Sequence, residues 1–267
     1  MSSISFLLHL YISKIKTLDK SFKIKELNLF FKDYETFSRG DLYAFYLQFD
    51  KELKETTFRW RIYNLKQQKV INTVARSIYT LSSKSEFYPA ISAKEEKIFS
   101  TISRQFPMLK GCIWNTNIVN ELMLHIPKKS LTIIEVENEA IELVFNFLKN
   151  EGHKNLFFQP GEKEIRHYIA SLENAIIVQS LVTKSPTQLV SKTTTTTLEK
   201  LLVDIYSNKN LFSTYQGTEL IHIFNKAYDK YILDFSKMLS YASRRNKKKE
   251  LIDFLETKTD IQNTYAK

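Results

Sequence analysis

The stretch from Lys54 to Gln67 combines basic, aromatic and amide side chains in a pattern suited to reading nucleic acid. Phe58, Ile62 and Leu65 recur at helical spacing, which predicts a helix with one buried face. Arginine donors match guanine edges and amide side chains match adenine edges in the major groove, while lysines suit phosphates. The sequence therefore predicts a DNA-recognition helix followed by a basic hairpin. The predicted contact residues are Lys54, Thr56, Thr57, Arg59, Arg61, Tyr63, Asn64, Lys66 and Arg76.

The predicted buried face fixes the expected direction of the other side chains on this helix. Trp60 stands on the outward side, where an exposed tryptophan is more typical of a protein contact or a partly buried rim than of a base reader. The alternative interpretation is a solvated basic helix that binds nothing. In the DNA-binding interpretation the outward residues are Thr56, Trp60, Tyr63 and Gln67, one flank holds Arg59 and Lys66, and the other holds Thr57, Arg61 and Asn64.

Glu135 and Glu137 form a second candidate site, because residues two apart on a strand share one face. Paired carboxylates of this kind bind metal in nucleotidyltransferases and nucleases. However, no glycine in the chain is followed by serine, as a nucleotidyltransferase turn requires, and Glu137 is followed by Asn138 rather than by the lysine of a restriction-type nuclease. The histidines and Cys112 show no ligand spacing. We therefore expect no enzyme activity, no metal and no cofactor, with a divergent metal-dependent nucleotidyltransferase or nuclease as an alternative.

A basic run near the C-terminus, residues 244–249, is predicted to lie on a helix. It suits contact with an acidic protein surface or with phosphates, and its plain alternative is a solvated helix face. The candidate contact residues are Arg244, Arg245, Lys247 and Lys248.

The elements around the basic helix predict an N-terminal domain over residues 1–82. Residues 1–12 have the spacing of an amphipathic helix, and residues 22–31 are predicted to form a short strand or turn followed by a helix. Ser38 with Asp41 three residues later predicts a capped helix that continues through Phe49. Two β-rich runs, 70–74 and 77–81, follow the basic helix and predict a hairpin. Helix, turn, basic helix and hairpin is the order of a winged helix-turn-helix.

Residues 83–95 are polar and are predicted to link this domain to a second one over 96–267. Strands are expected at 112–115, 131–137, 155–159 and 175–179, with 181–182 and 189–190 as a further pair, and helices lie between them and dominate after Thr196. The five threonines at 193–197 predict an extended segment and a helix cap. The fold class is therefore α+β overall: a winged helix-turn-helix, then an α/β domain with a helical C-terminal part.

Composition narrows the function classes. The 267 residues carry a net charge of +10, and residues 1–81 hold 14 Lys and Arg against 8 Asp and Glu. This excess favours a polyanionic partner for the N-terminal domain. A single cysteine fits a reducing compartment, and the apolar run at the N-terminus lacks the features of a signal peptide and is too short for a membrane span. We expect a cytoplasmic protein without membrane contact.

Several segments, taken in order, resemble AbiEi-type antitoxins of type IV, abortive-infection toxin–antitoxin systems. In the N-terminal half they are residues 37–42, 53–66 and 78–80. Ser77, immediately before the last of these segments, stands where the resemblance implies a glycine. In the C-terminal half they are residues 112–116, 134–137, 197–205, 215–220 and 239–245.

The resemblance implies a phage-defence antitoxin that acts as a transcriptional regulator of its own operon. Its partners would be double-stranded operator DNA, bound by the winged helix, and a cognate nucleotidyltransferase toxin, counteracted by the C-terminal domain directly or functionally. By analogy that domain would be a degenerate nucleotidyltransferase-like fold. A stand-alone winged-helix regulator whose α/β domain senses a ligand is the alternative.

Overall fold

The computed structural model describes residues 22–67, 70–81 and 86–261, and it divides into two compact units at Ser85 and Glu86. The fold class is α+β, as predicted. The predicted helix over residues 1–12 lies outside the described residues. Within the described part, no helix is both long enough and apolar enough to cross a membrane.

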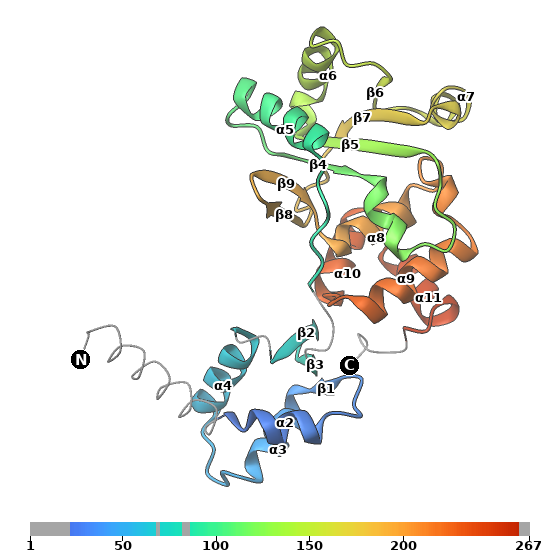
Figure 1. Ribbon diagram of the computed structural model, residues 1–267. Coiled ribbons are helices and arrows are strands. Elements are labelled where there is room, and N and C mark those ends of the chain that lie inside the picture. The colour runs from blue at the N-terminus through green and yellow to red at the C-terminus, as the bar shows by residue number, and fades with distance from the viewer. Residues whose placement is uncertain (1–21, 68–69, 82–85, 262–267) are drawn as a thin grey trace, which may run out of the picture. The chain divides into compact units, whose positions relative to one another are not determined.

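In its described residues the first unit has three helices and a three-stranded antiparallel sheet with the strand order β1-β3-β2 (Figure 1). The first helix occupies the predicted stretch, and the last two strands form the predicted hairpin. Its elements are α2 (Ile24–Phe30), β1 (Phe37–Ser38), α3 (Arg39–Leu47), α4 (Glu55–Gln67), β2 (Ile71–Ala75) and β3 (Ile78–Leu81).

Helix α3 begins at the capping box that the sequence predicted. The Asp41 backbone N–H donates to Ser38 Oγ at 3.1 Å, and the Ser38 N–H donates to Asp41 Oδ2 at 2.8 Å. These bonds satisfy donors that have no partner within the helix. Leu42, Phe45 and Tyr46 then turn into an aromatic-rich core that is shared with α2 and α4.

Ser77 occupies the hairpin turn in a left-handed conformation, with φ of 63°. This is the position at which the sequence analysis expected glycine, and it is held by a 2.7 Å bond from the Arg39 N–H to the Ser77 carbonyl. A β-branched side chain is the least suited to this region.

We expect Ser77→Val to lower the free energy of unfolding by about 1–2 kcal/mol, because a β-branched side chain is strained in the left-handed region. Ser77→Gly should leave it unchanged or raise it, because glycine adopts this conformation without steric cost. Urea unfolding of the full chain measures both variants. Equal stability of the two variants would contradict the expectation.

The second unit is built on a mixed sheet with the strand order β4-β5-β7-β6, in which β4 is antiparallel to β5 while β5, β7 and β6 are parallel. A separate hairpin, β8-β9, follows. The strands are β4 (Gly111–Asn115), β5 (Ser130–Val136), β6 (Leu156–Phe158), β7 (Asn174–Ser180), β8 (Thr187–Val190) and β9 (Thr193–Thr196).

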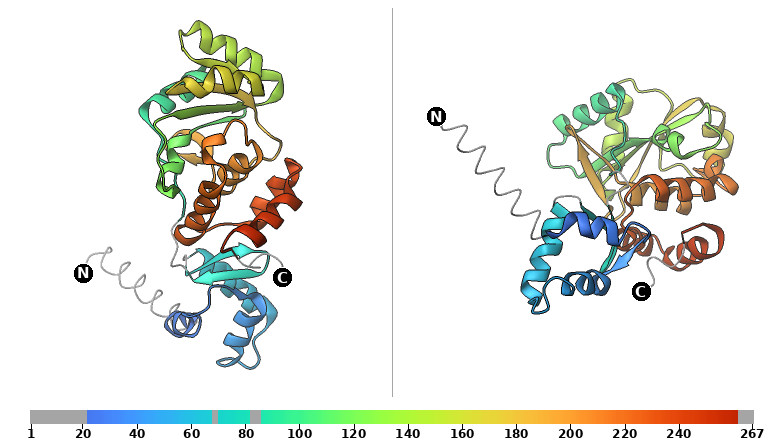
Figure 2. Two further views of the ribbon diagram at one scale, coloured as in Figure 1. Left: turned by 90° about the vertical axis from the view of Figure 1, so that its right-hand side faces the viewer. Right: turned by 60° about the horizontal axis from the view of Figure 1, so that its bottom comes forward.

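Helices cover both faces of this sheet, with α5 and α6 on one side and α8 and α10 on the other (Figure 1; Figure 2). The helices are α5 (Ala93–Gln105), α6 (Ile141–Asn150), α7 (Glu162–His167), α8 (Leu198–Ser207), α9 (Thr218–Lys230), α10 (Phe235–Arg244) and α11 (Lys248–Lys258). Short 3-10 helices are η1 (Thr116–Leu122), η2 (Asn138–Ala140), η3 (Ile169–Ser171) and η4 (Ser213–Tyr215).

Two local predictions need correction. The predicted linker 83–95 ends too late, because Ser92 and Glu95 form the capping box that opens α5 and the buried Phe87 ring contacts Tyr231 within the second unit. Residues 181–182 do not pair with 189–190, since β8 pairs with β9 through the threonine run. The predicted extended segment and cap are confirmed: Thr193–Thr196 is β9, and Thr197 caps α8.

Candidate functional site

Helix α4 has the two faces that its apolar spacing predicted. Phe58, Ile62 and Leu65 lie in the core of the first unit. The opposite side is exposed, and it is therefore the surface that a DNA groove or another partner would contact. The exposed residues among the predicted contacts are Lys54, Thr56, Thr57, Arg59, Tyr63 and Lys66, together with Arg76 in the hairpin turn.

Arg59 is the most accessible arginine of the helix, with 74% of its side chain exposed. Its Nε donates to Glu55 Oε1 at 3.0 Å, and the same carboxylate also receives Arg39. The hydrogen bond from Arg59 holds the pKa of Glu55 below its usual value, with Arg39 adding to the effect. An ion pair this exposed contributes little to stability, so Arg59 can exchange Glu55 for a phosphate or a base edge at low cost.

Arg61 was predicted as a base contact, but its side chain is largely enclosed within the first unit. Only 14% of its side chain is exposed. Its guanidinium lies 4.8 Å from the centre of the Tyr46 ring, and Nη2 is 3.6 Å from Asp50 Oδ2. The flank of α4 that carries Arg61 packs against α3 and the turn after it, which the spacing of α4 alone does not reveal.

Asn64, on the same flank, is half-buried, and its Nδ2 donates to the Trp60 carbonyl at 2.8 Å. Its amide donor therefore serves the helix rather than an adenine edge. Trp60 is 49% exposed and stacks on Phe22 with ring centroids 5.2 Å apart. It thus fits the predicted role of a partly buried rim.

We expect Arg61→Ala to lower the free energy of unfolding by about 1–2 kcal/mol through loss of the cation–π contact and the partly buried ion pair. Its effect on DNA affinity should be smaller than that of Arg59→Ala. Chemical unfolding and fluorescence anisotropy, run on both variants, compare the two effects. A fully stable Arg61→Ala protein with impaired DNA binding would restore Arg61 as a contact residue.

The second unit contains a buried network of charges between the sheet and its helices. Lys200 on α8 has no exposed surface, and its Nζ bonds to Glu135 on β5 and to Asp204 one turn along α8. Trp114 Nε1 donates to Glu135 Oε2 at 3.0 Å. Asp204 Oδ1 accepts bonds from the Tyr241 hydroxyl at 2.8 Å and from Arg245 Nη1 at 2.9 Å.

These contacts keep Glu135 and Lys200, the ion pair at the centre of the network, charged. Burial alone would raise the pKa of Glu135, but the attraction and hydrogen bond of Lys200 and the bond from Trp114 hold it below its usual value. Burial would lower the pKa of Lys200, yet Asp204 and Glu135 raise it well above the usual value. The stability that Glu135 contributes is therefore present above its unfolded pKa and is lost as the pH falls through its folded pKa.

The predicted carboxylate pair does not exist as a pair. Strand β5 ends at Val136, so Glu137 no longer follows the alternation that would place it beside Glu135. Glu135 is enclosed in the charge network, whereas Glu137 is half-buried and accepts a bond from the Lys110 N–H at 3.4 Å. Among the described residues, no three His, Cys, Asp or Glu side chains are arranged to hold a metal ion.

Sequence reasoning missed Lys200 and Asp204. The available signal was two opposite charges, four residues apart, that enclose the apolar residues 201–203. Cys112, predicted to be a small buried residue, lies at the edge of this network with Sγ 3.6 Å from Glu135 Oε2. Burial, followed by the charge of Glu135, raises the pKa of its thiol well above the usual value, which keeps the sulfur protonated and unreactive.

The C-terminal basic run was predicted to lie on one helix. In the structure it forms the junction between two helices. Helix α10 ends at Arg244 and α11 begins at Lys248, with Asn246 in a left-handed turn between them. Arg245 is turned inward, with only 18% of its side chain exposed, because it reaches Asp204. Lys247 pairs with Glu250 at 2.9 Å. Arg244 and Lys248 stay exposed and line a polar cavity of about 600 Å³ together with three serines of α10.

A search of curated proteins found none similar to this chain. The model of a family of unknown function, DUF6577, matches residues 57–261, from within α4 to the end of the described part of the second unit. The match spans more than half of the chain and includes residues of both units, and the protein is therefore a member of the DUF6577 family of unknown function.

Proposed function

We propose that this protein is a DNA-binding transcriptional regulator of the antitoxin type, whose first unit is a winged helix-turn-helix. The observation that carries the proposal is α4: a helix anchored by Phe58, Ile62 and Leu65 that presents Arg59, Tyr63 and Lys66 to solvent. The hairpin that follows α4 carries Arg76 at its exposed turn. A helix with this arrangement suits the major groove, with the hairpin turn at the phosphates.

The net charge of +10 supports a polyanionic partner. A regulator of this kind would work in the cytoplasm, in keeping with a single protonated thiol at Cys112. The function of the second unit in this proposal is to counteract a nucleotidyltransferase toxin, and its support is the likeness of the C-terminal segments to AbiEi-type antitoxins.

Binding of the full-length protein to a duplex from its own upstream region tests the DNA-binding half of the proposal. We expect binding that weakens steeply as salt rises, because phosphate contacts release counterions, and that exceeds binding to a scrambled duplex. Lys66→Ala should weaken both duplexes alike, whereas Arg59→Ala should weaken the specific one by about 1–3 kcal/mol. Absence of salt-sensitive binding to the upstream duplex would refute this half.

Co-expression with the nucleotidyltransferase encoded by an adjacent gene tests the antitoxin half. The full-length protein should restore growth, and so should a variant that no longer binds DNA, because protection is assigned to the second unit. A soluble, folded protein that leaves the cells poisoned would refute the assignment.

The second candidate function is a stand-alone regulator whose second unit senses a small ligand. The cavity at the sheet edge, described below, is the observation that favours it. An enzyme that uses Glu135 and Glu137 together is not supported, because the two carboxylates belong to different surroundings.

A further inference from the structure

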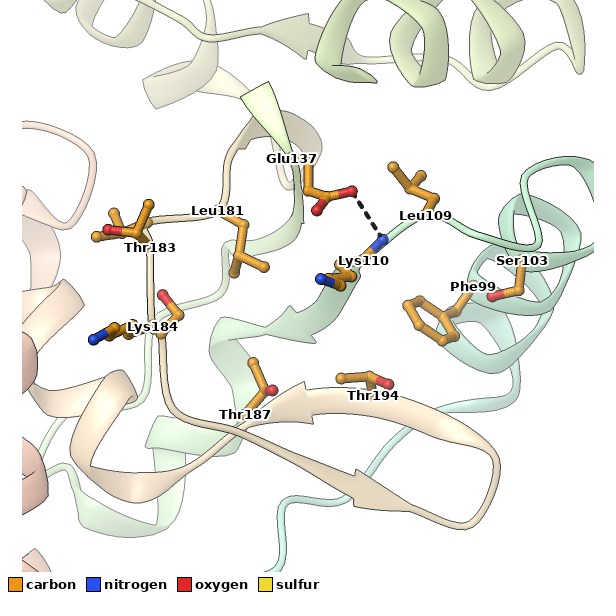
Figure 3. A pocket seen from close by; sticks show the side chains of 13 residues that line it. Phe99, Ser103, Leu109, Lys110, Glu137, Leu181, Thr183, Lys184, Thr187 and Thr194 are labelled. Atoms are coloured by element: carbon orange, nitrogen blue, oxygen red, sulfur yellow. Dashed lines mark hydrogen bonds between the residues drawn. The ribbon is translucent and has the colours of Figure 1, made fainter. Parts of the chain in front are cut away.

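A cavity of about 660 Å³ lies at the carboxyl ends of the parallel strands β5 and β7 in the second unit (Figure 3). Glu137 directly follows β5, and the segment from Leu181 to Ser185 directly follows β7. Helix α5 and the β8-β9 hairpin close the other sides through Phe99 and Thr194. The volume is within the range of cavities that hold small organic ligands.

The topology of the sheet explains why a cavity forms at the carboxyl ends of β5 and β7. After β5 the chain turns to α6, which packs on the same face of the sheet as α5. After β7 it runs instead to β8 and β9, which lie beside β4, and then to α8 on the other face. Neighbouring parallel strands whose connections diverge leave a crevice at their carboxyl ends, and α/β proteins bind ligands in such crevices.

The polar groups around the cavity are of both signs. Lys110 and Lys184 contribute exposed ammonium groups, and neither forms an ion pair with another described residue. Glu137 contributes a carboxylate whose described bond is to the backbone N–H of Lys110 and not to an ammonium group. In Figure 3 the Lys110 side chain lies between Leu181 and Phe99, while the Lys184 side chain points away from Lys110. Hydroxyl groups come from Thr183, Thr187 and Thr194.

The apolar part of the lining stands on both sides of the Lys110 side chain (Figure 3). Phe99 and Leu109, from α5 and the segment after it, lie on one side, and Leu181, from the end of β7, lies on the other. The side with Phe99 and Leu109 offers an aromatic ring and an aliphatic side chain to a flat apolar group. The cavity thus combines an apolar wall, a carboxylate acceptor and two cations.

We propose that this cavity binds a nucleoside phosphate. The phosphate would lie at Lys110 and would be reached by Lys184 through rotation of its exposed side chain, since ammonium groups form charge-assisted hydrogen bonds with phosphate oxygens. A sugar hydroxyl would donate to the Glu137 carboxylate, which only accepts. The base would lie against Phe99 and Leu109, where its flat surface is removed from water. This binding requires nothing of the DNA-contacting surface of the first unit.

Isothermal titration of the full-length protein tests the proposal, with ATP and GTP as ligands and with adenosine and inorganic phosphate as partial ligands. We expect at least one nucleotide to bind more tightly than either partial ligand. Lys110→Gln and Lys184→Gln should each weaken nucleotide binding about tenfold, the change that one charge-assisted contact of ~1.4 kcal/mol represents. Glu137→Gln should weaken nucleotide binding without affecting inorganic phosphate.

Lys154→Gln is the matched control, because Lys154 is exposed and precedes β6, at the amino ends of the parallel strands and so at the other end from the cavity. It should bind nucleotides as the unaltered protein does, and so should Lys66→Ala on α4. The proposal is overturned if no nucleotide binds at millimolar concentration, or if the Lys110→Gln, Lys184→Gln double variant binds as well as the Lys154→Gln control. Equal affinity for nucleotides and inorganic phosphate would also overturn it, in favour of a simple anion site.

Discussion

Replacing Lys200 with methionine is expected to lower the free energy of unfolding by about 3–5 kcal/mol, the usual cost of removing one partner from a buried ion pair. Methionine fills a similar volume but carries no charge. Glu135, with no exposed surface, would then lose its ammonium partner, and Asp204 would keep only Tyr241 and Arg245. Glu135 would have to remain charged without its ion-pair partner or take up a proton, and both outcomes are costly in the interior.

Chemical denaturation of the full-length protein, monitored by tryptophan fluorescence, measures this loss. Lys226→Met on α9 is the control, because Lys226 is exposed and a surface substitution of this kind changes stability by about 0.5 kcal/mol or less. The double variant Glu135→Gln, Lys200→Met should lose less stability than the two single variants added together, since it removes both charges of one pair. If Lys200→Met is as stable as Lys226→Met, the network does not hold α8 on the sheet.

Removing three exposed cations of the first unit together, by Lys54→Ala, Arg59→Ala and Lys66→Ala, is expected to reduce affinity for the upstream duplex by roughly 100- to 1,000-fold at physiological salt. The substitutions remove two cationic side chains from the outward side of α4 and one from the residue before it, while the core residues remain. Since the two lysines are assigned to phosphates, the slope of log affinity against log salt should fall by about 1.8, which is about 0.9 for each contact.

A variant with the same change in net charge separates local contact from overall charge. Lys149, Lys154 and Lys209 are exposed lysines of the second unit, and their combined replacement by alanine should leave the salt dependence of DNA binding nearly unchanged. Equal loss of affinity in both triple variants would show that the net charge, rather than the surface of α4, attracts DNA. Circular dichroism of both variants confirms that the helices are retained.

Local patterns in the sequence determined several parts of the fold. The spacing of Phe58, Ile62 and Leu65 identified the buried face of α4, and Ser38 with Asp41 identified the start of α3. The threonine run was correctly divided between β9 and the cap of α8. Each of these features depends on residues within one or two turns of a helix or within one strand, so a short stretch of sequence contains all the information required.

Tertiary structure decided where the charged groups lie. Arg61 and Arg245 were both read from sequence as surface contacts, but each turns inward toward an aspartate, Asp50 and Asp204 respectively.

The Glu135–Lys200 pair joins residues 65 positions apart. The Glu135 carboxylate is enclosed because Cys112 lies opposite Glu135 in the β4-β5 pairing and α8 packs over the same face. Strand β5 ends one residue later, at Val136, and Glu137 therefore lies at the edge of the cavity instead. Periodicity states which face a residue occupies, whereas the partner that neutralises a charge depends on which distant element is packed against that face.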